Sequence, residues 1–136
     1  MDEDRLTPQL GRLIDQAKAA ALRVSSPGAK TEGVALLAGD GTVYTGHPGV
    51  DPAYGGADPA GALLSAAEAA LVSARRAGCV EILAAAVAVA NDPAETVFPS
   101  DGSRRALAGI DPDLPLVVKQ HGRWVLLLLS QLPSPE

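Results

Sequence analysis

Residues able to hold a soft metal ion are scarce in this chain. It has one cysteine, Cys79, which excludes an intramolecular disulfide, and two histidines, His47 and His121. Zinc in proteins is held by clusters of thiolates and imidazoles, usually three or four per ion. The composition therefore offers little from which to build a metal site, and we expect neither zinc nor another cofactor. Both histidines are expected in exposed turns.

Two other groups of residues have types and spacing suited to chemistry. A helix start with Ser100, Gly102 and Ser103, followed by Arg104, could bind an anion such as phosphate, because the first N–H groups of a helix are unpaired. The same residues also make an ordinary helix start, with Ser100 as the N-cap. Glu68 could act as a general acid or base, or it could be a good helix former without a chemical role.

Composition and charge exclude several classes of partner. The chain has 136 residues and is 47% hydrophobic, enough for a single domain over residues 1–136. Aromatic residues make up 3% and the net charge is -5, so we expect no nucleic-acid partner. The N-terminus is acidic, and the most apolar stretch, residues 125–129, is too short to span a bilayer. A cytoplasmic protein without a membrane partner is the expectation.

Hydrophobic periodicity predicts the elements that must position these residues. Apolar residues three and four apart predict helices over residues 8–24 and 62–77, and the serine cap at Ser100 predicts a short third helix over 100–109. Apolar stretches bounded by turn residues predict strands over 33–38, 42–46, 81–90, 114–119 and 123–129, with loops over 47–61 and 91–99. Residues 82–89 are almost uninterruptedly apolar, which is typical of a strand covered on both faces. This order predicts an α/β fold with three layers, α/β/α, around a mixed five-stranded sheet.

Several strings in this order resemble the cytidine deaminase family of zinc-dependent nucleoside deaminases. Its first strand pair is similar to residues 33–37 and 42–46, which flank Asp40-Gly41. Its C-A-E helix start is similar to Ala66-Ala67-Glu68, its P-C-x-x-C motif to residues 99–103, and its final E-L-L-P to residues 130–133. The resemblance spans nearly the whole chain. It implies the cytidine deaminase fold and a homo-oligomer, either a dimer or a tetramer.

The positions that carry the family's chemistry are mostly replaced in this sequence. In the family, one Cys or His and two Cys residues hold Zn²⁺, and a Glu moves the proton as zinc-bound hydroxide attacks the pyrimidine. Carried over through the motifs, the three ligands fall on Ala66, Ser100 and Ser103, and the proton-moving Glu falls on Glu68. An alanine methyl has no donor atom, and serine hydroxyls are poor zinc donors. The resemblance therefore implies a metal site whose ligands are degenerate.

The residues that read the ribose in the family are replaced as well, here by Pro48 and Val50. The preferred hypothesis is a catalytically degenerate deaminase-like protein that acts as an oligomeric structural or interaction module, with Glu68 as a relic. A second hypothesis is a nucleoside- or nucleotide-binding protein, or a hydrolase, that uses the old pocket without zinc. A third is a deaminase with an unconventional metal site.

Overall fold

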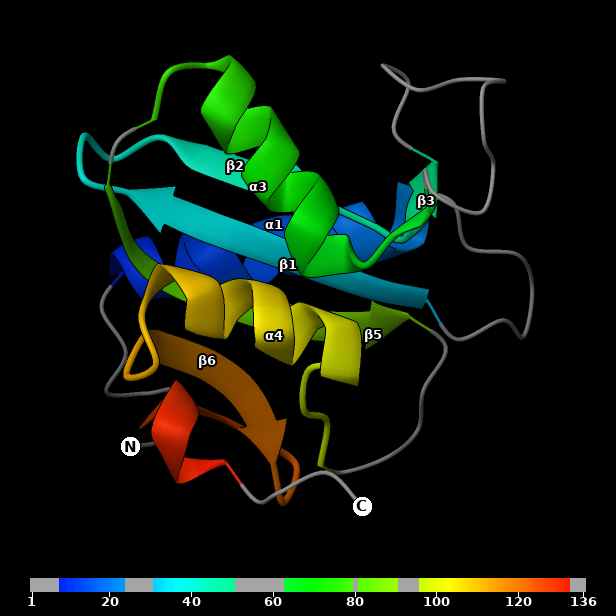
Figure 1. Cartoon of the computed structure of the whole chain (residues 1–136). Helices are drawn as coiled ribbons and strands as arrows, with labels where there is room; N and C mark the ends of the chain where they lie inside the picture. The colour runs from blue at the N-terminus through cyan, green and yellow to red at the C-terminus, as the bar shows by residue number, and fades with distance from the viewer. Residues whose placement is uncertain (1–7, 24–30, 51–62, 80, 91–95, 133–136) are drawn as a thin grey trace.

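A mixed five-stranded sheet in the order β2-β1-β5-β6-β7 forms the centre of the molecule (Figure 1). The structure, a computed structural model, describes residues 8–23, 31–50, 63–79, 81–90 and 96–132. The strands are β1 (Thr31–Ala38), β2 (Val43–Gly46), β5 (Ile82–Ala90), β6 (Pro115–Gln120) and β7 (Arg123–Leu128). Strand β1 runs antiparallel to β2 and β5, β5 is parallel to β6, and β7 returns antiparallel to β6.

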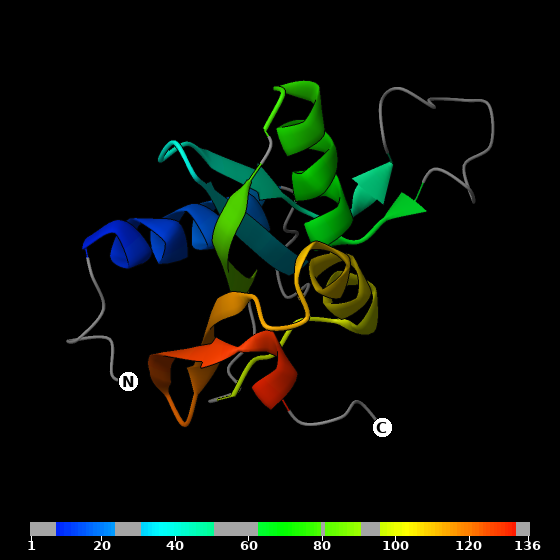
Figure 2. The same cartoon turned by 60° about the vertical axis from the view of Figure 1, so that its left-hand side comes forward.

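Helices cover both faces of this sheet. They are α1 (Pro8–Arg23), α3 (Ala66–Arg76) and α4 (Asp101–Ile110). Figure 2 shows α1 on one side of the strands and α3 with α4 on the other. None of the helices in the described ranges is long and apolar enough to cross a membrane. The predicted α/β/α arrangement around a mixed sheet is confirmed.

Successive side chains along the strands point to opposite faces of the sheet and pack into two separate hydrophobic cores. Val34 and Leu36 of β1 face α3 and α4, whereas Ala35 and Leu37 face α1. Strand β5 contributes to both cores in the same way, with Ala85 and Val87 on the first face and Ala84, Ala86 and Ala88 on the second. This division explains why the β5 sequence is apolar at nearly every position, since both of its faces are covered.

Two glycines permit close contact between the layers. A Cβ at Gly46 of β2 would lie 2.3 Å from the backbone nitrogen of Ala70 in α3. A Cβ at Gly33 of β1 would lie 2.2 Å from the carbonyl oxygen of Ala17 in α1. Neither distance is physically attainable, so the helices can approach these strands only because the side chains are missing.

The structure corrects several predicted boundaries. Strand β1 begins at Thr31 rather than at residue 33, which brings Glu32 into the sheet. Residues 47–61 are not entirely loop, because β3 (Gly49–Val50) pairs with β4 (Leu63–Leu64) in a small two-stranded sheet. The predicted helix over 62–77 consequently begins at Ala66, since Leu63 and Leu64 are in a strand. The last strand ends at Leu128, and Leu129 opens a short 3-10 helix, η3 (Leu129–Gln131).

Candidate functional site

Helix α3 begins with a capping box. The Ser65 hydroxyl accepts a hydrogen bond from the Glu68 backbone N–H at 3.2 Å, and the Glu68 carboxylate accepts one from the Ser65 N–H at 3.0 Å. These reciprocal bonds satisfy two donors that a helix start otherwise leaves unpaired. Glu68 is exposed and has a structural role at this helix start.

Helix α4 begins at a second serine cap. The Ser100 hydroxyl accepts a hydrogen bond from the Ser103 N–H at 3.4 Å, and Asp101 occupies the first turn. An N-cap serine followed by an acidic residue matches the partial positive charge at this end of a helix. The predicted N-cap of this helix, Ser100, is therefore confirmed.

The two helix starts lie directly against one another. The buried Ser103 hydroxyl of α4 accepts a hydrogen bond from the Ala67 N–H of α3 at 3.1 Å. A Cβ at Gly102 would lie 3.1 Å from the Ser65 Cβ, so this position has little room for a side chain. Ala66 is fully buried beside Ala67. The fold thus brings Ala66, Ser100 and Ser103 into one small region.

A carboxylate from the sheet completes this region. Glu32 of β1 accepts hydrogen bonds from the Ser103 hydroxyl at 2.6 Å, the Ser100 hydroxyl at 3.1 Å and the Ser100 backbone N–H at 2.8 Å. We call Glu32, Ser100, Ser103 and the Ala67 N–H the Glu32 cluster. Its carboxylate lies at the N-terminus of α4, where the helix dipole favours a negative charge.

The Ser103 hydroxyl both donates and accepts a hydrogen bond within the Glu32 cluster. This oxygen donates one hydrogen bond to Glu32 and accepts one from Ala67, and among the described residues no buried side-chain polar atom lacks a partner. Satisfied buried networks hold neighbouring elements in one arrangement, because a broken bond leaves an unpaired polar group. The cluster ties β1, α3 and α4 together.

The residues of the predicted anion site lie around this cluster. Ser100 and Ser103 donate to Glu32, and the Arg104 Nε donates to the Pro99 carbonyl oxygen at 3.4 Å. The chain's own carboxylate therefore already uses the serine donors. An external anion would compete with Glu32 for them.

Glu68 also lines a cleft of about 370 Å³ between α3 and α4. Arg75 of α3 and Arg105 of α4 line the same cleft. Both arginines are exposed, so two positive charges and the Glu68 carboxylate border this cleft.

The remaining soft ligands lie apart from the Glu32 cluster. His121 is exposed in the β6–β7 turn with a φ of 52°, as expected of a turn residue. His47 is half-buried rather than exposed, because it lies between β2 and β3. Cys79 is half-buried, and its thiol donates to the Glu81 carbonyl oxygen at 3.4 Å. In the described ranges no three His, Cys, Asp or Glu side chains converge as metal ligands would.

Sequence reasoning missed Glu32. Glu32 lies just before the predicted strand over 33–38, and its partners are 68 and 71 residues away, so no local pattern pointed to it. Of the ribose positions, Pro48 is exposed, and Val50 is in β3. Most of the longer loop, residues 51–62, lies outside the described residues.

Comparison with known proteins identifies the fold. No protein-family model and no curated protein sequence matches the chain. The cytidine deaminase from Burkholderia pseudomallei is 26% identical, with a TM-score of 0.69 over 92% of this chain and 94% of that one. The cytidine deaminase from Mycobacterium tuberculosis is 23% identical, with a TM-score of 0.64 over 89% and 90%. That from Mycobacterium leprae is 21% identical, with a TM-score of 0.64 over 92% and 98%. The chain has the cytidine deaminase fold.

Proposed function

We propose that this protein is a catalytically degenerate cytidine deaminase-like protein that acts as an oligomeric structural or interaction module. The observation that carries this proposal is the Glu32 cluster. The region where the resemblance places the family's zinc is held together here by hydrogen bonds between a carboxylate and two serines.

The donor set in this region does not suit Zn²⁺. The three ligand positions carry a methyl group, Ala66, and two hydroxyls, Ser100 and Ser103, and both hydroxyls are bonded to Glu32. Catalytic zinc needs about three protein ligands drawn from thiolates, imidazoles and carboxylates. One carboxylate that is already hydrogen-bonded does not supply them. Glu68, at the position of the proton-moving residue, forms a capping box with Ser65.

Metal analysis and a deaminase assay test the loss of catalysis. The purified protein, expressed with added zinc, is expected to contain zinc far below one equivalent and to leave cytidine unchanged by ultraviolet absorbance. The cytidine deaminase from Burkholderia pseudomallei, purified and assayed in parallel, is the positive control. Stoichiometric zinc together with cytidine turnover that Glu68→Gln abolishes would refute the proposal.

An exposed apolar sheet edge supports self-association. Strand β7 is the last strand in the sheet order, and the Leu128 side chain on it is 39% exposed. Trp124 and Leu126 on the same strand are half-buried. An edge strand presents unpaired backbone groups, and apolar side chains beside them favour contact with a second copy.

Light scattering after size-exclusion chromatography tests the oligomer. We expect the mass of a dimer or tetramer for the wild-type chain and a lower mass for Leu128→Glu. Leu83→Glu is the matched control, because Leu83 is similarly exposed at 43% but lies at the start of β5. A monomeric wild-type protein, or equal effects of the two substitutions, would contradict assembly through β7.

The cleft between α3 and α4 favours a second candidate, a nucleoside- or nucleotide-binding protein. Arg75 and Arg105 could contact a phosphate there, and Glu68 could accept hydrogen bonds from a sugar or base. A ligand that binds only the folded state raises its melting temperature. A thermal shift with cytidine monophosphate that Arg105→Gln removes would support this candidate, and the absence of any shift would rule against it.

A further inference from the structure

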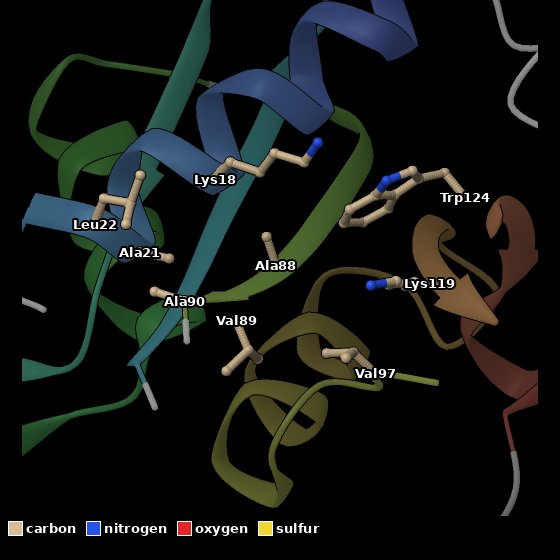
Figure 3. Close-up of a pocket in the computed structure, with 9 residues that line it drawn as sticks. All are labelled: Lys18, Ala21, Leu22, Ala88, Val89, Ala90, Val97, Lys119 and Trp124. Atoms are coloured by element: carbon tan, nitrogen blue, oxygen red, sulfur yellow. The ribbon is translucent and has the colours of Figure 1, made fainter. Parts of the chain in front are cut away.

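A second recess lies on the opposite face of the sheet, between α1 and the strands β5, β6 and β7. Its volume is about 230 Å³. Figure 3 shows Lys18 extending from α1 toward Trp124, and Lys119 and Trp124 reaching the recess from the β6–β7 hairpin. It shares no lining residue with the Glu32 cluster, so a ligand here would be independent of the proposed function.

Small side chains create this space. Ala21 of α1 and Ala88 and Ala90 of β5 are buried and line the recess with methyl groups, and Val97 closes one wall. A cavity of about 150 Å³ lined by apolar side chains holds one benzene ring. The recess is therefore large enough for one aromatic ring with a small polar group, and smaller than the roughly 300 Å³ at which drug-sized pockets begin.

Two ammonium groups converge on the recess. Lys119 and Trp124 are directly opposed across the β6–β7 pair, which places both side chains on the same face of the sheet. The Lys18 Nζ lies 5.2 Å from the centre of the Trp124 ring, within the range of a cation–π contact. Figure 3 shows both lysines directed toward the space beside the indole. Among the described residues that line the recess, none is a carboxylate.

We infer that this recess binds a one-ring aromatic carboxylate. The ring would lie on the alanine methyl groups beside Trp124, and the carboxylate would pair with the Lys18 and Lys119 ammonium groups. An apolar floor with few convergent charged groups is the usual composition of a small-molecule site. The chain has a net charge of -5, but the two lysines make this recess locally positive, so it attracts an anion.

Fluorescence titration with benzoate tests this inference directly. Trp124 is the only tryptophan in the chain, so its emission reports on this recess without interference from other sites. We expect a saturable change in emission with benzoate, and weaker effects with benzyl alcohol, which lacks the charge, and with acetate, which lacks the ring. Isothermal titration calorimetry should give the same dissociation constant.

Substitutions then assign the binding to the lysines. Lys119→Met and Lys18→Met keep the aliphatic stems and remove the charges, and each should weaken benzoate binding about tenfold, the equivalent of one charge-assisted contact. Arg12→Gln removes an exposed cation from the same helix outside the recess and should leave the affinity unchanged. Emission that does not respond to benzoate up to about 10 mM would overturn the inference. Equal affinity for benzoate and benzyl alcohol would overturn it too, as would wild-type affinity in both lysine variants.

Discussion

Replacing Glu32 with glutamine changes one carboxylate oxygen into an amide NH₂ without altering the shape of the side chain. In the native cluster one oxygen accepts from both serine hydroxyls and the other accepts from the Ser100 backbone N–H. The amide can keep its oxygen toward the hydroxyls, but its NH₂ then faces the Ser100 N–H, and two donors cannot bond to each other. The hydrogen bond from the Ser100 N–H is lost, and the two hydrogen bonds from the serine hydroxyls then go to a neutral acceptor instead of a charged one.

The expected cost follows from these contacts. A hydrogen bond to a charged group contributes about 1.5–3 kcal/mol, with partly exposed bonds at the lower end. The negative charge at the N-terminus of α4 adds about 0.3–1 kcal/mol. We therefore expect Glu32→Gln to lower the free energy of unfolding by about 2–3 kcal/mol, of which the lost bond is the larger part.

Urea unfolding followed by circular dichroism and Trp124 fluorescence measures this change. Asp15→Asn is the matched control, since it makes the same carboxylate-to-amide change on the exposed side of α1. A double-mutant cycle of Glu32→Gln with Ser103→Ala should show that the combined loss is smaller than the two single losses added together, because the residues share a hydrogen bond. A loss for Glu32→Gln within about 0.5 kcal/mol of wild type, the usual range of a surface change, would refute the reasoning.

Three further predictions concern other parts of the fold. Gly46→Ala should cost about 3 kcal/mol or more in urea unfolding, because the new Cβ overlaps the α3 backbone; Gly11→Ala, with open space at its Cβ inside α1, should instead stabilise by about 0.5–1 kcal/mol. Ser65→Ala removes one half of the α3 capping box and should lower the free energy of unfolding by about 1 kcal/mol, and a helix that melts at the wild-type temperature would contradict this. The hydrogen bond from the Thr42 N–H lowers the pKa of the Asp40 carboxyl below its usual 3.8. Ionised Asp40 therefore stabilises the fold at pH values above 3.8, and this contribution is lost as the pH falls through the lowered pKa. Acid titration of unfolding should therefore show a smaller loss of stability below about pH 4 for Asp40→Asn than for wild type.

Local sequence signals account for most of the sheet and its helices. The unbroken apolar run of β5 and the serine cap of α4 are contained within short windows, and both were predicted where they occur. The start of α3 was placed too early because Leu63 and Leu64 fit the helical periodicity of the residues that follow them. The capping box formed by Ser65 and Glu68 is a local signal that would have fixed this boundary.

The composition of the candidate site could be predicted only in part. The motifs identified Ser100 and Ser103, since both lie at the recognisable start of one helix, α4. Glu32 joins them only through tertiary contacts across 68 to 71 residues, which no local pattern encodes. The recess beside Trp124 is equally non-local, because it depends on which alanines of β5 face α1.

The hydrogen bond between Glu32 and Ser103 also constrains the order in which this sequence could change. A cysteine at position 100 or 103 would lie within hydrogen-bonding distance of the Glu32 carboxylate, and repulsion between two like charges would raise the thiol pKa and disfavour the thiolate that binds a metal. Removing Glu32 first would relieve the repulsion but would cost the stability that its three hydrogen bonds provide. A thiolate is therefore favoured in this region only in a chain that has already lost the Glu32 hydrogen bonds.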